Sequence, residues 1–188
     1  MKQATTALER VAIGLASLVL SIGLIAILSG FFQSHDPAGV NGTSGPAGQQ
    51  FADLGHTHLR VDELRPPYNS DPPTSGAHVP VRVTRDRSHL SNDQLLQALE
   101  VGDVVIAYGS RQPPVGLPKL ARTVAGPFTP TLAAAGQAVI LWPRRGTNGL
   151  MGLAWTRMLQ VRTPGSLLQS FAERWLGRGA PGHSTTAP

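Results

Sequence analysis

The residues of this chain best suited to chemistry are histidines, and three of them, His58, His78 and His89, lie within one stretch of the sequence. Imidazole nitrogens bind copper and zinc, and three imidazoles suit either metal. His56 precedes His58 by two residues, and we expect the pair to face opposite sides of an extended segment, so that only one of them reaches a given site. Two interpretations stay open: a copper or zinc site of His58, His78 and His89, or histidines that are exposed or hydrogen-bonded for structural reasons.

His78 ends a loop of restricted conformation, which runs from Tyr68 as Tyr-Asn-Ser-Asp-Pro-Pro-Thr-Ser-Gly-Ala-His. Proline fixes its own φ and disfavours helical backbone at the preceding residue, so the segment Asp71–Pro73 runs extended. Gly76 then permits a sharp turn, which would fix the direction of the His78 side chain. A loop of this kind suits a ligand site, and it is also typical of a buried structural loop, which is the commoner role of such turn chemistry.

Nothing else in the sequence is typical of an enzyme. Ser70, Ser75 and Ser88 lie in no nucleophile elbow, and the chain has neither a phosphate-binding glycine-rich loop nor a His-Glu-X-X-His helix. Glu100 and His78 are the one acid–base pair we single out, but we expect Glu100 to cap a helix or to pair with an arginine. The chain has no cysteine, which excludes disulfides, thiolate metal sites and cysteine nucleophiles. We therefore predict a protein without enzymatic activity.

The N-terminal part predicts a membrane anchor. Val11–Phe32 is a long apolar run, and about 20 such residues span the hydrocarbon core of a bilayer. A signal peptide has a shorter apolar region of about 7 to 15 residues followed by a small-X-small cleavage site, and no convincing site of this kind follows Phe32. Lys2 and Arg10 precede the run, so the positive-inside rule places the N terminus in the cytoplasm and the rest of the chain outside.

The predicted organisation has five parts. Residues 1–10 are a cytoplasmic segment, 11–32 a transmembrane helix, 33–51 a flexible linker rich in glycine, serine and proline, 52–181 an extracytoplasmic domain, and 182–188 a disordered tail. At this length the chain has room for one domain with a single core.

The domain itself is predicted to be α+β, with a short sheet covered by helices on one side. Ser91 with Gln94 forms a capping pattern that starts a helix, and Gly102 ends it. Further elements are a short strand at 58–61, a buried strand at 104–108, a helix at 117–124, and strands at 138–142 and 152–156 that form a hairpin around the turn 144–149. Thr163 is predicted to cap a last helix with Pro164 at its first position.

The segment Tyr68–Gly76, followed by Ala77 and His78, resembles the signature of domain-of-unknown-function family 3105, found in bacterial envelope proteins that mostly carry one N-terminal membrane segment. The likeness extends to Gly55-His56-Thr57-His58 and to the segment 99–108, and it covers about residues 52 to 181. Family members usually have His-X-Leu-Glu-His-Gly where this chain has Gln97-Ala98-Leu99-Glu100-Val101-Gly102. If the histidines of the family bind a metal together, this chain keeps only His58 and His78. The resemblance thus implies a divergent member that retains the scaffold for another purpose.

The charge of the chain favours acidic partners. Its formal net charge is +5, and Arg144 and Arg145 form a basic pair in a predicted turn. A basic domain near a membrane is attracted to anionic lipid headgroups or to an acidic protein, whereas the basic run with interleaved aromatic residues that is typical of nucleic-acid binders is absent from the sequence. The hypothesis is a single-pass, membrane-anchored, non-catalytic binding or accessory subunit of a membrane or envelope complex, with Arg144 and Arg145 as partner-binding residues. The alternative is a histidine-based copper or zinc binding protein.

Overall fold

The computed structural model describes residues 45–182, which form one α+β unit. The predicted cytoplasmic segment, transmembrane helix and most of the linker lie outside these residues. Among the helices of residues 45–182, none is both long and apolar enough to cross a membrane.

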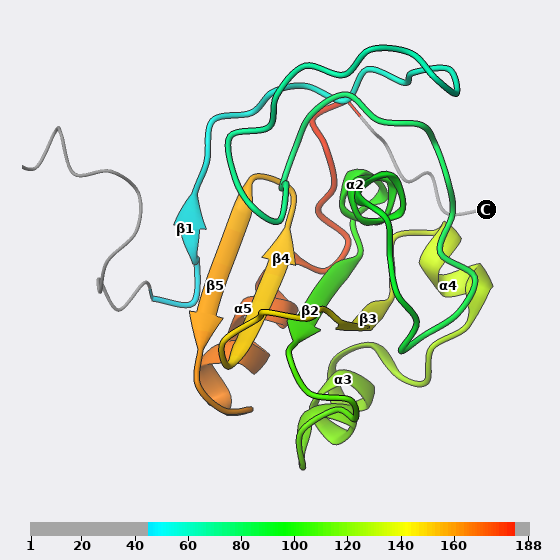
Figure 1. Cartoon of the computed structure of the whole chain (residues 1–188). Coiled ribbons are helices and arrows are strands. Elements are labelled where there is room, and N and C mark those ends of the chain that lie inside the picture. The colour runs from blue at the N-terminus through cyan, green and yellow to red at the C-terminus, as the bar shows by residue number, and fades with distance from the viewer. Residues whose placement is uncertain (1–44, 183–188) are drawn as a thin grey trace, which may run out of the picture. The chain divides into compact units, whose positions relative to one another are not determined.

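The centre of the domain is a five-stranded mixed sheet with the order β1-β5-β4-β2-β3 (Figure 1). β2 and β3 run parallel, and the other neighbouring pairs run antiparallel. The elements in chain order are β1 Gln49–Gln50, α2 Asn92–Val101, β2 Val104–Tyr108, α3 Leu117–Ala125, α4 Pro130–Ala134, β3 Val139–Pro143, β4 Leu150–Ala154, β5 Arg157–Val161 and α5 Ser166–Trp175. The sheet thus includes two residues, Gln49 and Gln50, that the sequence assigned to the linker.

Both faces of the sheet are covered, which corrects the prediction of helices on one side. Alternate residues of β2 divide between two core clusters: Val105 packs with residues of α2 and α4, and Ile106 packs with residues of α3 and α5. All five side chains of β2 are buried, as expected for a strand with a layer of helices on each side.

Several predicted elements are confirmed. Ser91 and Gln94 form a complete capping box at the start of α2, and Gly102 ends this helix with a left-handed backbone. β2 has the predicted bounds, and α3 extends one residue beyond its predicted end. These are the elements whose start or end signals lie in adjacent residues.

The predicted hairpin of the strands near 138–142 and 152–156 is wrong, because β2 lies between β3 and β4 in the sheet. β4 instead forms its hairpin with β5, which the sequence analysis did not include. The tight turn between them has Thr156 at a positive φ of 59°, a position at which a glycine would have been the usual signal. The last helix begins after Gly165 and not after Thr163, since residues 162–165 lead the chain out of β5.

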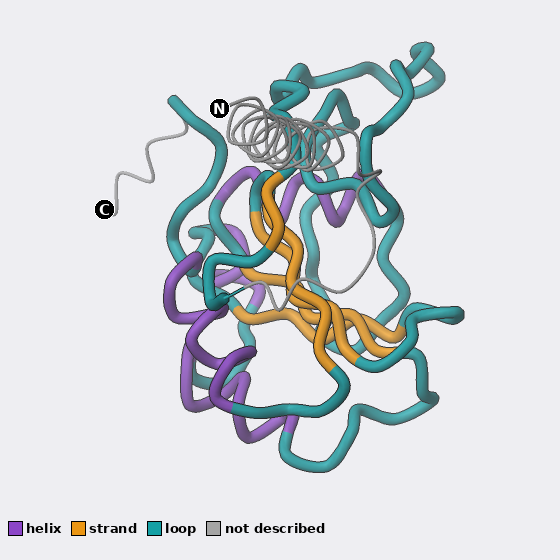
Figure 2. The backbone as a smooth tube through the Cα atoms, turned by 90° about the vertical axis from the view of Figure 1, so that its left-hand side faces the viewer, coloured by secondary structure: helices purple, strands orange, loops and turns teal. Residues whose placement is uncertain are grey.

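A long irregular segment connects β1 to α2 and carries the histidines. It runs across one end of the sheet in Figure 1, coloured cyan to green, and Figure 2 draws it as loop throughout. The strand predicted at 58–61 is only an isolated parallel bridge between His58 and His78. This bridge brings together two residues that are separated by the whole Tyr68–Gly76 loop.

Candidate metal centre

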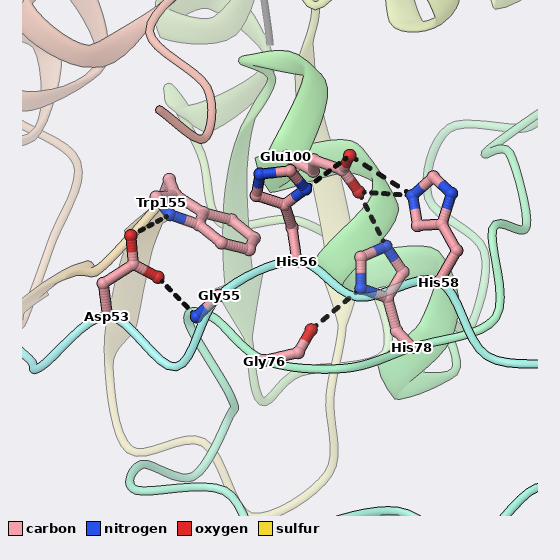
Figure 3. A network of polar contacts seen from close by, with 8 residues as sticks. All are labelled: Asp53, Gly55, His56, His58, Gly76, His78, Glu100 and Trp155. Atoms are coloured by element: carbon pink, nitrogen blue, oxygen red, sulfur yellow. Dashed lines mark hydrogen bonds and ion pairs between the residues drawn. The ribbon is translucent and has the colours of Figure 1, made fainter. Parts of the chain in front are cut away.

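Three side chains meet where the irregular segment crosses the end of α2. His58, His78 and Glu100 each offer one ligand atom, and these three atoms lie within 4.8 Å of one another (Figure 3). His78 and Glu100 are fully buried, with side chains 0% and 1% exposed, whereas His58 is 45% exposed. Two of the three side chains are therefore buried, and solvent reaches the cluster at His58.

Glu100 reaches the cluster from the last turn of α2. Its neighbours Leu95, Leu96 and Leu99 anchor this helix in the core, and this anchoring fixes where the carboxyl group lies. A buried acid at a helix C terminus is unfavourable twice, because it loses hydration and faces the negative end of the helix dipole. Partners must offset this cost, and the histidines His56, His58 and His78 contact the carboxyl group.

His78 is held in place by backbone contacts on both sides. Its N–H donates to the Thr57 carbonyl at 3.1 Å, and its own carbonyl accepts from the Leu59 N–H at 2.8 Å. Gly76 turns the chain with a φ of 128°, as its position predicted, and its N–H donates to the Gly55 carbonyl. The two loops are thereby fastened side by side.

The ring of His78 has only one nitrogen left for the cluster. Nδ1 lies 2.9 Å from the Gly76 carbonyl oxygen, which can only accept, so Nδ1 carries the proton of that hydrogen bond. Nε2 lies 3.0 Å from Glu100 Oε2, yet it is buried and has no hydrogen-bond partner of acceptable geometry within residues 45–182. A histidine with Nδ1–H bonded to a backbone carbonyl and Nε2 turned to an acid has the orientation of a metal ligand.

His58 and His56 both reach the same carboxyl group. His58 Nε2 lies 3.2 and 3.0 Å from the two oxygens of Glu100, and His56 Nδ1 lies 3.6 Å from Oε1. The expectation that these histidines face opposite sides is wrong, because the segment is not a regular strand and strict alternation does not apply. Asp53 holds the segment before His56, since its carboxyl group accepts from the Gly55 N–H and from Trp155 Nε1.

The other predicted site residues lie elsewhere. His89 is exposed and is not part of the cluster. Arg144 donates to both carboxyl oxygens of Asp71 at 2.7 and 2.8 Å and lies over the Trp142 ring, so it fastens the Tyr68–His78 loop to the end of β3. Arg145 is exposed and remains the more accessible of the two arginines.

Glu100 is the functional candidate that sequence reasoning assigned to the wrong partners. We expected it to cap the helix or to pair with an arginine, but the groups around it in Figure 3 are imidazoles. A signal was available, since Glu100 lies between Leu99 and Val101, just before the buried strand Val104–Tyr108. An acid in such a stretch is buried, and a buried acid needs a partner.

Two of the separations between the candidate ligand atoms are close to those of a metal centre. Bonds of 2.0 to 2.1 Å in a tetrahedral zinc site separate neighbouring ligand atoms by about 3.3 Å. Each imidazole Nε2 lies 3.0 Å from Glu100 Oε2, so small side-chain movements would admit an ion. Two histidines and one carboxylate leave a fourth position for water or another ligand, as in open zinc sites.

Comparison with known proteins places the chain in a family but not in a functional class. No curated protein and no solved structure matches it significantly. The family described as "Protein of unknown function (DUF3105)" matches residues 62–184, a range that contains His78 and Glu100 and begins after His58. Since this match covers well over half of the sequence, the chain belongs to the DUF3105 family.

Proposed function

We propose that this protein binds one divalent transition-metal ion, zinc or copper, through His58, His78 and Glu100. The observation that carries the proposal is the His78 ring: one nitrogen is occupied by a backbone carbonyl, and the other is buried against a carboxyl group without a hydrogen bond. A metal ion would satisfy that nitrogen and neutralise the acid at the same time.

Glu100 adds a third ligand to His58 and His78, the two histidines that the family resemblance left to this chain. Two histidines make a weak site, since zinc sites use three or four protein ligands. The carboxyl group supplies a third ligand, and its charge favours a cation in a buried place. His56 is not one of the three ligands. Its Nδ1 lies 3.6 Å from Glu100 Oε1, so its ring would stabilise the metal-bound carboxyl group.

The competing explanation is a structural network in which protonated histidines neutralise Glu100 without any metal. The two explanations differ in stoichiometry. Metal binding by the three residues saturates at one ion per chain and depends on each of them, whereas a structural network binds no ion tightly at this place.

The test is a metal titration of the full chain, purified in mild detergent and stripped with a chelator. We expect one equivalent of zinc or copper by elemental analysis after gel filtration, and loss of that equivalent in His78→Ala and Glu100→Gln. His89→Ala is the matched control, because it removes an exposed histidine outside the cluster and leaves stoichiometry unchanged. Equal metal content in His78→Ala and the unaltered protein would refute the proposal, provided that circular dichroism shows both to be folded.

The cellular setting remains the one suggested by the sequence. We propose a single-pass membrane protein with its domain outside the membrane, acting without catalysis as an accessory subunit of a membrane or envelope complex; the apolar run Val11–Phe32 supports the anchor. Purification through a C-terminal tag tests this part. A stoichiometric membrane partner across several detergents would support the accessory role, and a protein that is always recovered alone would contradict it.

A further inference from the structure

Four arginines lie in connections at one end of the sheet. Tyr108 at the end of β2 pairs with Pro143 and Leu150 in its two neighbouring strands. Leu150 in turn pairs with Val161 at the end of β5. The connections after β2, β3 and β5 therefore begin side by side at the same end of the sheet. These connections carry Arg111, Arg144, Arg145 and Arg162.

Close backbone contacts join these connections into one surface. A Cβ on Gly109 would collide with the Thr147 carbonyl oxygen, so the connection after β2 touches the one after β3. A Cβ on Gly149 would lie 3.2 Å from the Cα of Arg162, so the turn after β3 also touches the connection after β5. The arginines therefore share one end of the domain and are not scattered over it.

We call Arg111, Arg145 and Arg162 the arginine rim. All three side chains are exposed, and among residues 45–182 none of them forms an ion pair. Arg144 is not part of the rim, because Asp71 neutralises it. Residues 104–172 contain seven lysines and arginines and no aspartate or glutamate, so no acid of the strands or of these connections offsets the rim. A surface of this charge favours an anionic partner.

The chain enters the domain from the end at which the rim lies. β1 is antiparallel to β5, with Gln49 beside Met158, so the residues just before β1 come from the direction of Val161. In Figure 1 the chain accordingly enters β1 from below, the side on which α3 lies. Residues 33–44 separate the apolar run Val11–Phe32 from the domain, and a segment of this length spans at most about 43 Å. An anchor in the apolar run would therefore keep the rim close to the bilayer.

We propose that the arginine rim binds the anionic headgroups of the bilayer in which the chain is anchored, an inference that rests on the proposed membrane anchor. Each arginine close to an anionic surface strengthens binding about fivefold, so the three together contribute on the order of 100-fold. Val115 lies in the same connection as Arg111 and is 99% exposed, so its apolar side chain would enter the boundary between headgroups and acyl chains.

An acidic protein segment is the competing occupant of the rim. Lipid is favoured because the anchor holds the rim within reach of the bilayer, which raises the effective concentration of headgroups around it. The orientation that follows concerns the metal cluster. Glu100 precedes the start of β2, whereas the rim follows its end, so binding of the rim to the bilayer turns the metal ligands away from the membrane.

The test places a fluorescent label on the full chain reconstituted into vesicles. Since the chain has no cysteine, Val115→Cys can carry a single label, and Val61→Cys is the matched control because Val61 is an exposed valine close to His58 in the sequence. The vesicles contain phosphatidylcholine and a nitroxide-bearing lipid as quencher, with or without about one third phosphatidylglycerol. We expect quenching at position 115 to be at least about threefold stronger in the anionic vesicles, and to weaken at about 1 M salt because charges are then screened. Quenching at position 61 should stay low in both kinds of vesicle.

Charge variants test whether the rim is the surface that binds. The rim variant combines Arg111→Gln, Arg145→Gln and Arg162→Gln, and it should lose the difference in quenching between the two kinds of vesicle. The control variant removes the same charge from exposed arginines outside the rim, through Arg60→Gln, Arg82→Gln and Arg178→Gln, and it should keep the difference. Equal quenching at positions 115 and 61, or equal effects of the two variants, would overturn the proposal.

Flotation of the vesicles separates this inference from the proposed anchor. An anchored chain floats with phosphatidylcholine vesicles whether or not its rim is intact. If the unaltered chain floats only with anionic vesicles and the rim variant floats with neither, the anchor proposal fails and lipid binding by the rim is supported. An anchored chain whose label at position 115 is not quenched in anionic vesicles would overturn lipid binding and leave an acidic protein as the occupant.

Discussion

Replacing Asp103 by asparagine should change how the stability of the domain depends on pH. Asp103 is 1% exposed, and burial raises its pKa from 3.8 to about 8. Asparagine has nearly the same shape and can keep the hydrogen bond from the Ala138 N–H, but it does not titrate. The substitution therefore removes the ionisation and leaves the packing close to unchanged.

The magnitude follows from the two pKa values. Between about pH 4 and pH 8 the folded protein holds the Asp103 proton and the unfolded chain does not, so the free energy of unfolding falls as pH rises. Each unit of pKa difference corresponds to about 1.4 kcal/mol, and a rise from 3.8 to about 8 corresponds to about 6 kcal/mol over the whole window. Between about pH 5 and pH 7 the expected loss is about 3 kcal/mol. Asp103→Asn should not suffer this loss.

The assay is urea unfolding of both proteins at several pH values in the presence of a chelator, followed by tryptophan fluorescence. The free energy of unfolding of Asp103→Asn minus that of the unaltered protein should rise by about 3 kcal/mol from about pH 5 to pH 7. Contributions of the histidine cluster are common to both proteins and cancel in this difference. Parallel pH profiles would contradict a raised pKa of Asp103, because they would mean that this residue is hydrated and ionised in the folded domain.

Three further predictions concern single side chains. Glu100→Gln should lower zinc affinity at least about 100-fold in competition with a chromophoric chelator, because the charged ligand is lost; an unchanged affinity would exclude Glu100 as a ligand. Gly136→Ala should destabilise the domain by more than about 2 kcal/mol, because the added Cβ would collide with the Val101 carbonyl oxygen. Gly146 also has a positive φ but lies in open space, so Gly146→Ala should cost only about 1 kcal/mol. Equal losses of unfolding free energy in urea would contradict this prediction. Ser91→Ala should cost about 1 kcal/mol in the same assay by removing the capping box of α2, and no measurable change would mean that the cap is unimportant.

The parts of the fold that could be predicted are those with local signals. The capping box at Ser91, the glycine at position 102 and the apolar run of β2 are each encoded in neighbouring residues, and α2 and β2 follow. Strand order has no signal in neighbouring residues. A hairpin of β3 and β4 is the simpler arrangement, but β3 pairs in parallel with β2, to which the chain connects it through α3 and α4. β5 was missed because the turn before it uses Thr156 at positive φ where a glycine would have been the signal.

The candidate site was predicted only in part for a similar reason. His58 and His78 were both among the predicted ligands, and the parallel bridge does bring them together. Glu100 was assigned other partners because it follows His58 by 42 residues, and only the packing of α2 against the irregular segment brings the two side chains into contact. His89 has the same chemistry as the other two histidines but is exposed outside the cluster, which the residue type alone could not indicate.

The most direct test of a metal centre is anomalous diffraction at the zinc absorption edge from crystals of the zinc-loaded protein. We expect one strong peak about 2 Å from Nε2 of His58, Nε2 of His78 and a carboxyl oxygen of Glu100. A zinc-loaded crystal with no peak at this place, or with its main peak at His89, would show that His58, His78 and Glu100 do not form a metal centre.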